Sequence, residues 1–216
     1  MKNYKYVLFD LDGTLTESGE GIINSAVYAL KKFGIEPEIS TMTKFLGPPL
    51  KDSFRDFYGF DDEKCEQAVK YYREYYTTKG IFENRVYEGV EDCLKMLWEA
   101  GFHLAVATSK PQVFAVKILE HFHLAQYFDY IGGAELDGSR SVKAEVIVHT
   151  LKNCGVNDRS QVIMAGDRQH DVLGAKALGI DCIGMLYGYG TREELSKAGA
   201  AYIAETPLEA AKWLLG

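Results

Sequence analysis

Four short apolar runs recur along the chain and predict the strands of a sheet. The first is Tyr6–Phe9, and the others cover residues 104–107, 162–165 and, more weakly, 182–185. Continuous apolar runs, as opposed to alternating ones, are typical of strands buried on both faces. The runs therefore indicate a parallel sheet at the centre of the protein.

Stretches with helical periodicity separate these runs. Residues 90–100 place apolar side chains on one helix face, namely Val90, Cys93, Leu94, Leu97 and Trp98. Gly101 then follows as a helix stop. The same periodicity covers residues 113–122, 144–151 and 172–178. Strands that alternate with helices predict an α/β fold with a Rossmann-like, doubly wound parallel sheet.

The stretch after the first strand interrupts this alternation. Its patterns are helical, with no buried-strand run between them, and they cover residues 21–33, 41–45, 50–58 and 61–78. We therefore expect two domains. Residues 1–15 and 86–216 would form the core with the sheet, and residues 16–85 would form an inserted α-helical domain.

Composition and charge limit the function. The 216 residues amount to about one and a half domains at roughly 150 residues each, and 47% hydrophobic and 25% charged residues are ordinary for a globular protein. A net charge of −7 offers no basic surface, so we expect no nucleic-acid partner. No apolar stretch approaches the roughly 20 residues that span a bilayer, and the N-terminal run is too short for a signal peptide. We therefore expect no membrane partner and a cytoplasmic location.

Acidic residues follow the first strand directly, in the segment Asp10-Leu11-Asp12-Gly13-Thr14. Sites in open α/β sheets lie at the carboxyl ends of the strands. Asp10 and Asp12, two apart in an extended segment, would face the same side. Gly13 would let the backbone turn and bring N–H groups close to an anion. The alternative is a simple Asp-Gly turn.

Polar residues follow the second strand, in Thr108-Ser109-Lys110. The Thr108 hydroxyl would reach the same sheet edge, although it could instead cap the next helix. Lys143 opens a later helix, where a positive charge is unfavourable unless an anion lies nearby. The alternative for Lys143 is a solvated surface position.

Two further carboxylates, Asp167 and Asp171, follow the third strand at a spacing of four residues. That spacing places both on one helix face, although they could serve only as an N-cap and a first-turn acid. Together with Asp10 and Asp12 they converge on one sheet edge. Like charges at such a site need neutralisation, and carboxylates are the ligands that Mg²⁺ prefers. The cluster therefore predicts a Mg²⁺ cofactor.

These four motifs, in this order, resemble those of the haloacid dehalogenase superfamily of phosphatases. More narrowly, the chain resembles the phosphoglycolate phosphatase-like and 5′-nucleotidase-like members, which carry a helical cap. The resemblance spans essentially the whole chain, and residues 16–85 fall where such enzymes insert the cap. It implies a phosphatase for a small phosphorylated metabolite.

The resemblance also implies a role for each matched residue. Asp10 would be the nucleophile that forms an aspartyl-phosphate, and Asp12 would be the general acid and base. Asp10, Asp167, Asp171 and the backbone carbonyl of Asp12 would hold Mg²⁺, with Asp171 acting directly or through water.

The remaining motif residues would hold the phosphoryl group. The resemblance implies this role for Thr108 and Lys143, supported by backbone N–H groups near Leu11, Asp12 and Ser109. Many relatives place Pro after the lysine of the third motif, whereas this chain has Ala144. Lys110 therefore remains an alternative to Lys143 as the phosphate-binding lysine.

The expected cap contains a stiff turn at Leu46-Gly47-Pro48-Pro49. Gly47 and Pro48, with Lys51 and Arg55 on the following helix, are candidates for contacting the leaving group. The alternative is a plain turn between two helices.

Other functions remain possible at this point. A phosphomutase of the β-phosphoglucomutase type keeps the same acids, and a non-catalytic phosphate-binding regulator could share the fold. A signalling receiver domain uses a similar Asp, Thr and Lys set but has no helical insertion after its first strand. We expect a monomer or a weak homodimer.

Overall fold

The computed structural model describes residues 4–216, and the chain divides into two compact units. One unit, called the core unit, comprises residues 1–16 and 86–216, and the other, called the helical unit, comprises residues 17–85. Among the described residues, no helix is both long and apolar enough to cross a membrane.

The core unit contains a six-stranded sheet in the order β5-β4-β1-β6-β7-β8. Every neighbouring pair in it is parallel. The strands are β1 (Tyr6–Phe9), β4 (His103–Pro111), β5 (Tyr130–Ala134), β6 (Val162–Gly166), β7 (Asp181–Met185) and β8 (Tyr202–Ala204). The predicted α/β fold and the four predicted strands are confirmed, while β5 and β8 were not predicted.

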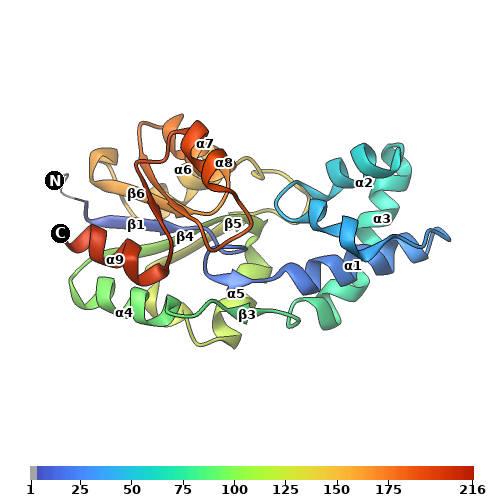
Figure 1. Ribbon diagram of the computed structural model, residues 1–216, viewed down its shortest axis with the longest axis horizontal. Helices are drawn as coiled ribbons and strands as arrows, with labels where there is room; N and C mark the ends of the chain where they lie inside the picture. Colours follow the sequence, from blue (N-terminus) through green and yellow to red (C-terminus); the bar gives the residue numbers. More distant parts are fainter. Residues whose placement is uncertain (1–3) are drawn as a thin grey trace. The chain divides into compact units, whose positions relative to one another are not determined.

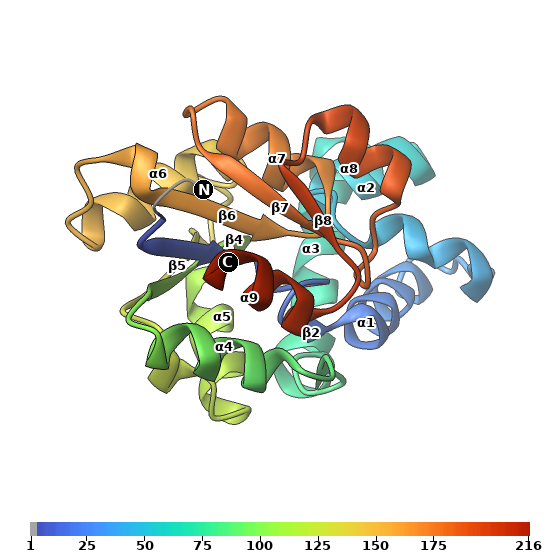
Figure 2. The same ribbon diagram turned by 60° about the vertical axis from the view of Figure 1, so that its left-hand side comes forward.

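Helices cover both faces of this sheet, as Figures 1 and 2 show. One face carries α4 (Val90–Glu99), α5 (Gln112–His121) and α9 (Pro207–Leu215), and the other carries α6 (Lys143–Asn153), α7 (Gln169–Lys176) and α8 (Arg192–Ala198). Short 3₁₀ helices, Ala125–Tyr127 and Arg159–Gln161, complete the unit. Leu8, Met164 and Val146 belong to a fully buried cluster on the α6–α7 side. The central strands β1 and β6 are apolar along their length because the sheet is covered on both faces.

The helical unit is built from α1 (Gly19–Lys31), α2 (Leu50–Tyr58) and α3 (Asp62–Tyr75). Its predicted helix at 41–45 is part of a 3₁₀ helix, Ile39–Phe45, and the pattern predicted to be helical to residue 78 ends in a π-helical turn, Tyr76–Gly80. Aromatic rings form its interior, including Phe45 and Phe54 with centroids 5.2 Å apart. Where the chain passes between the units, β2 (Thr16–Glu17) pairs with β3 (Arg85–Val86).

Candidate active site

The carboxyl ends of three adjacent strands carry the predicted site residues of the core unit. Asp10 follows β1, Thr108 lies within β4, and Asp167 follows β6. The Asp10 N–H donates to the carbonyl of Ala165 at 2.9 Å, which extends the β1–β6 pairing to the first acid. The sheet therefore places residues that are far apart in sequence next to one another, at the edge where open α/β sheets bind ligands.

Three carboxylates meet at this edge. Asp10, Asp167 and Asp171 each offer an oxygen, and these oxygens lie within 4.8 Å of one another. Asp167 and Asp171 are buried, and the Asp10 side chain is 14% exposed. Burial raises the pKa of Asp10 and of Asp167, and the charges of neighbouring carboxylates raise both further. The cluster is therefore unfavourable as a set of bare anions.

Lys143 supplies positive charge beside two of these acids. Its Nζ lies 2.9 Å from Asp10 Oδ1 and 2.8 Å from Asp171 Oδ1. Burial alone would lower the lysine pKa, but the charges of the two carboxylates outweigh burial and the pKa is raised. Lys143 therefore stays protonated although its side chain is buried, and it lies at the start of α6 as predicted.

Lys143 leaves carboxylate oxygens of the three-acid cluster available to bind a further ligand. Its ammonium donates a hydrogen bond to the carbonyl of Ala107 at 3.0 Å. Oδ1 of Asp10 and Oδ1 of Asp171 are buried, and the same ammonium is the cation that both of these oxygens contact. One ammonium among three carboxylates leaves an excess of negative charge, and such an all-oxygen donor set fits a hard divalent cation.

Asp12 has a lysine of its own. Lys110 Nζ lies 2.7 Å from Asp12 Oδ2, and the lysine side chain is almost buried. The carboxylate of Asp12 is not part of the three-acid cluster found among residues 4–216. The sequence presented Lys110 and Lys143 as alternatives, whereas the structure brings both to the site, each on a different acid of the first motif.

Small residues and a hydroxyl complete the first two motifs. The Thr108 hydroxyl is buried, accepts a hydrogen bond from the Lys110 N–H at 3.3 Å, and opposes the rise in the pKa of Asp10. Ser109 is exposed. Gly13 has a φ of 82°, and a Cβ at that position would lie 2.3 Å from Asp167 Oδ2. No side chain fits between the two motifs at Gly13.

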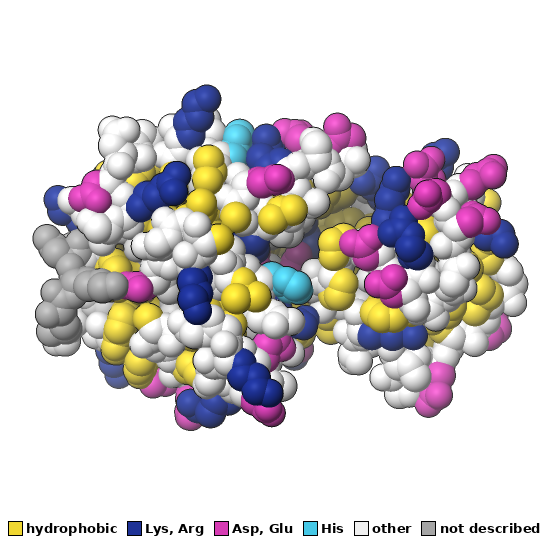
Figure 3. Space-filling view, turned by 90° about the horizontal axis from the view of Figure 1, so that it is seen from above, with side chains coloured by type: hydrophobic (Ala, Val, Ile, Leu, Met, Phe, Trp, Pro, Cys, Tyr) yellow, Lys and Arg dark blue, Asp and Glu magenta, His cyan; other side chains and the backbone are white. Residues whose placement is uncertain are grey.

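The candidates for contacting the leaving group lie in the helical unit. Gly47 and Pro48 form the turn before α2, and Gly47 has a φ of 108°. Lys51 forms an ion pair with Glu66 at 3.1 Å. Arg55 forms ion pairs with Asp52 at 3.0 Å and with Asp62 at 2.7 Å. Basic and acidic side chains also intermix on the face seen in Figure 3. Both basic side chains are therefore engaged by acids of their own unit.

Contacts to Asp167 from two other segments were missed by sequence reasoning. The Thr14 hydroxyl donates to Asp167 Oδ1 at 3.2 Å, and the Tyr189 N–H donates to Oδ2 at 2.7 Å. The sequence signal was available, because Gly188-Tyr189-Gly190 follows the fourth apolar run and so lies at a strand's carboxyl end.

Comparison with known proteins gives consistent results. The family model described as haloacid dehalogenase-like hydrolase matches residues 7–185. A 5′-nucleotidase from Pseudomonas aeruginosa is 46% identical over 193 residues, which cover 89% of this chain and 87% of that protein. The tyrosine-protein kinase PtkA from Mycobacterium tuberculosis is 40% identical over 198 residues, which cover 91% of this chain and 67% of the kinase.

Solved structures agree with these matches. A structure described as a predicted phosphatase from Clostridium acetobutylicum is 51% identical and superposes with a TM-score of 0.93, covering 98% of both chains. The match extends through the core unit and the helical unit alike.

Proposed function

Since the chain belongs to the haloacid dehalogenase-like hydrolase family and is a phosphatase that acts on small phosphoesters, we propose that it hydrolyses phosphomonoesters with Mg²⁺ through an aspartyl-phosphate on Asp10. The match of the family model to residues 7–185 confirms the family that the sequence resembled. The observation that supports the proposal most directly is the buried cluster of Asp10, Asp167 and Asp171 beside Lys143.

In the first step, Asp10 attacks phosphorus and the bond from phosphorus to the ester oxygen breaks. Asp12 gives its proton to the departing oxygen, and phosphate is then covalently held by the Asp10 carboxylate. In the second step, a water attacks phosphorus, Asp12 takes the proton of that water, and the bond to Asp10 breaks. Inorganic phosphate leaves, and Asp12 is again protonated for the next substrate.

Lys143 and Thr108 would hold the transferring group. The Lys143 ammonium beside Asp10 would contact phosphoryl oxygens as negative charge shifts during transfer, and the Thr108 hydroxyl would donate to another. Phosphoryl transfer depends on in-line positioning and charge neutralisation more than on elaborate covalent chemistry. A rigid, buried pair of donors meets that requirement.

The carboxylates of Asp10, Asp167 and Asp171 and the backbone carbonyl of Asp12 would hold Mg²⁺. When bound, the ion neutralises charge shared by the nucleophile and the phosphoryl oxygens. Its site is supported by the close approach of the three carboxylates and by the excess of negative charge that the Lys143 ammonium leaves uncompensated.

The substrate would be of the phosphoglycolate or nucleoside monophosphate type. Relatives named 5′-nucleotidase and phosphoglycolate phosphatase support both possibilities, at 46% and 31% identity. A phosphomutase of the β-phosphoglucomutase type would use the same acids and is the alternative. The similarity to a tyrosine-protein kinase makes ATP a necessary member of any substrate panel.

The test of the proposal is hydrolysis of p-nitrophenyl phosphate by the purified protein. We expect turnover with Mg²⁺ and none with EDTA, and we expect Asp10→Asn to lose at least about 10³-fold in kcat while remaining folded. Asp56→Asn, an exposed acid on α2, is the matched control and should keep full activity. Turnover by Asp10→Asn close to that of the control would refute the role of Asp10 as nucleophile.

A substrate panel then separates the alternatives. It comprises phosphoglycolate, nucleoside monophosphates, pyrophosphate, sugar phosphates and ATP, each assayed for release of phosphate. Conversion of glucose 1-phosphate to glucose 6-phosphate would indicate a mutase, and transfer from ATP to a tyrosine peptide would indicate a kinase. Release of phosphate from one class at a rate far above the others supports the proposed function.

A further inference from the structure

The segment Tyr187–Glu194, which follows β7, contacts the predicted metal ligand Asp167 from outside the four motifs. We call it the 187–194 segment. The backbone N–H of Tyr189 donates to Asp167 Oδ2 at 2.7 Å. The Thr14 hydroxyl donates to Oδ1 of the same carboxylate. Rotation of the Asp167 carboxylate would therefore break a hydrogen bond at each of its oxygens.

Two glycines allow the segment to approach this closely. A Cβ at Gly188 would lie 2.4 Å from the Cβ of Asp167 and 2.2 Å from the carbonyl oxygen of Gly13, and a Cβ at Gly190 would lie 2.0 Å from the carbonyl oxygen of Asp167. Real Cβ atoms do not tolerate these distances. The backbone of the segment is therefore packed directly on the backbone and side chain of Asp167.

Glu194 fixes the other end of the segment to the same loop. Its Oε1 accepts hydrogen bonds from Arg168 Nε and from the N–H of Gln169, both at 2.8 Å. These are the two residues that follow Asp167. The Glu194 pKa is lowered, because these two donors outweigh the effect of partial burial, so the side chain is a carboxylate at neutral pH.

Thr191 holds Glu194 in place. The Thr191 hydroxyl accepts a hydrogen bond from the Glu194 N–H at 3.1 Å and caps the start of α8. A series of hydrogen bonds therefore connects the cap of α8, through Glu194, to the loop that carries Asp167. Glu194 is not among the acids of the cluster found within residues 4–216, which comprises Asp10, Asp167 and Asp171.

We propose that the 187–194 segment positions Asp167 for a divalent metal, and that Glu194 is a positioning residue for that metal which does not touch it. The inference rests on the metal site of the proposed function. Groups that orient a ligand from behind commonly change metal affinity about 10- to 100-fold when they are removed. The buried, mutually repelling acids make such support necessary, because an unsupported carboxylate would turn away from its neighbours.

The experiment is a titration of the substrate-free, metal-free protein with Mn²⁺, followed by electron paramagnetic resonance. We expect Glu194→Ala to raise the Kd for Mn²⁺ about 10-fold or more. Glu194→Gln should fall between that variant and the wild type, because its amide oxygen still accepts from Arg168 and Gln169. This milder variant also guards against loss of folding in Glu194→Ala.

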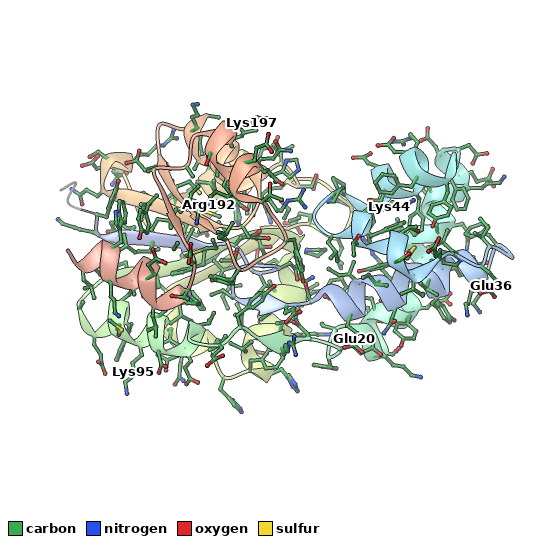
Figure 4. All side chains as sticks on the ribbon, in the orientation of Figure 1. Glu20, Glu36, Lys44, Lys95, Arg192 and Lys197 are labelled. Carbon is green, nitrogen blue, oxygen red and sulfur yellow. The ribbon has the colours of Figure 1, made fainter. Side chains whose placement is uncertain are left out.

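Glu193→Ala is the matched control, one residue earlier on α8. Glu193 pairs at 2.6 Å with Lys197, and both side chains are about three-quarters exposed. Figure 4 labels Lys197 on the outer side of α8. We expect the Glu193→Ala variant to bind Mn²⁺ as the wild type does.

Activity provides a second readout that separates positioning from general damage. We expect Glu194→Ala to need more Mg²⁺ for half-maximal rate but to approach the wild-type kcat at saturating Mg²⁺. Equal Mn²⁺ affinity in Glu194→Ala and Glu193→Ala would overturn the positioning role, and so would a lower kcat with unchanged affinity. Absence of Mn²⁺ binding by the wild type would instead overturn the metal site on which the inference rests.

Discussion

The buried Lys143 ammonium contacts two carboxylates of the site. Because removing one partner of a buried ion pair leaves a charge without compensation, we expect Lys143→Met to lose about 3–5 kcal/mol in the free energy of unfolding. The same variant should lose about 10²-fold or more in kcat if the lysine also stabilises the transferring phosphoryl group. Urea denaturation with EDTA present measures the stability.

The control for Lys143 lies on the same helix. Lys152 is exposed in the last turn of α6, and Lys152→Met should change the free energy of unfolding by less than about 0.5 kcal/mol. Equal urea midpoints for the two variants would show that the ion pairs of Lys143 contribute no net stability.

The packing of α7 on α6 depends on Gly174. A Cβ there would lie 2.8 Å from Lys143 Cγ and 3.2 Å from the backbone N of Ala144. Replacing a helix-interior glycine with alanine ordinarily stabilises by about 1 kcal/mol, but overpacking costs about 1–3 kcal/mol. We expect Gly174→Ala to destabilise the protein and lower its activity, as measured by thermal unfolding and phosphatase assay. An increase in Tm would mean that the helices can separate without cost.

The elements that the sequence could predict are those with a local pattern. β1 and β6 were found because each is a continuous apolar run. β5 was missed because Gly132 and Gly133 break its apolar run. A Cβ at Gly132 would lie 2.0 Å from Thr150 Oγ1 on α6. The glycine is therefore needed for the packing of α6, which follows later in the chain. β8 has three residues and gives too short a pattern.

The same distinction applies to the site. The meeting of Asp10 and Asp167 could be predicted because each follows a strand of one parallel sheet. The partner of Lys110 could not, because the sequence offered no way to choose between the two acids of the first motif. The contact of Tyr189 with Asp167 depends on a backbone N–H, which every residue except proline carries, so only the flanking glycines gave any indication.

The two units of the whole molecule have separate interiors, and their fluorophores are distributed unequally. Both tryptophans, Trp98 on α4 and Trp213 on α9, belong to the core unit. Phe54, in contrast, is fully buried in the helical unit. Tryptophan emission therefore reports on the core unit, whereas far-ultraviolet circular dichroism reports on both units.

This separation predicts how a helical-unit mutant unfolds. We expect Phe54→Ala to remove about 3–5 kcal/mol of stability from the helical unit. Part of the dichroism signal should then be lost at a lower urea concentration than the tryptophan transition, whose midpoint should stay near the wild-type value. Phe57→Ala, at a side chain that is 37% exposed, should have a smaller effect. A coincident shift of both signals would show that the two units unfold as one.

The central position of β1 has a consequence for synthesis of the chain. β1 is synthesised before the other strands of the sheet, and its neighbours begin only at His103 and Val162. The helical unit is complete in the growing chain before β4 or β6 has been synthesised. Both edges of the apolar strand β1 therefore stay unpaired during that time. Asp10 is therefore made well before Asp167, Asp171 and the 187–194 segment. A chain that stops short of β6 can therefore form the helical unit but cannot assemble the catalytic cluster.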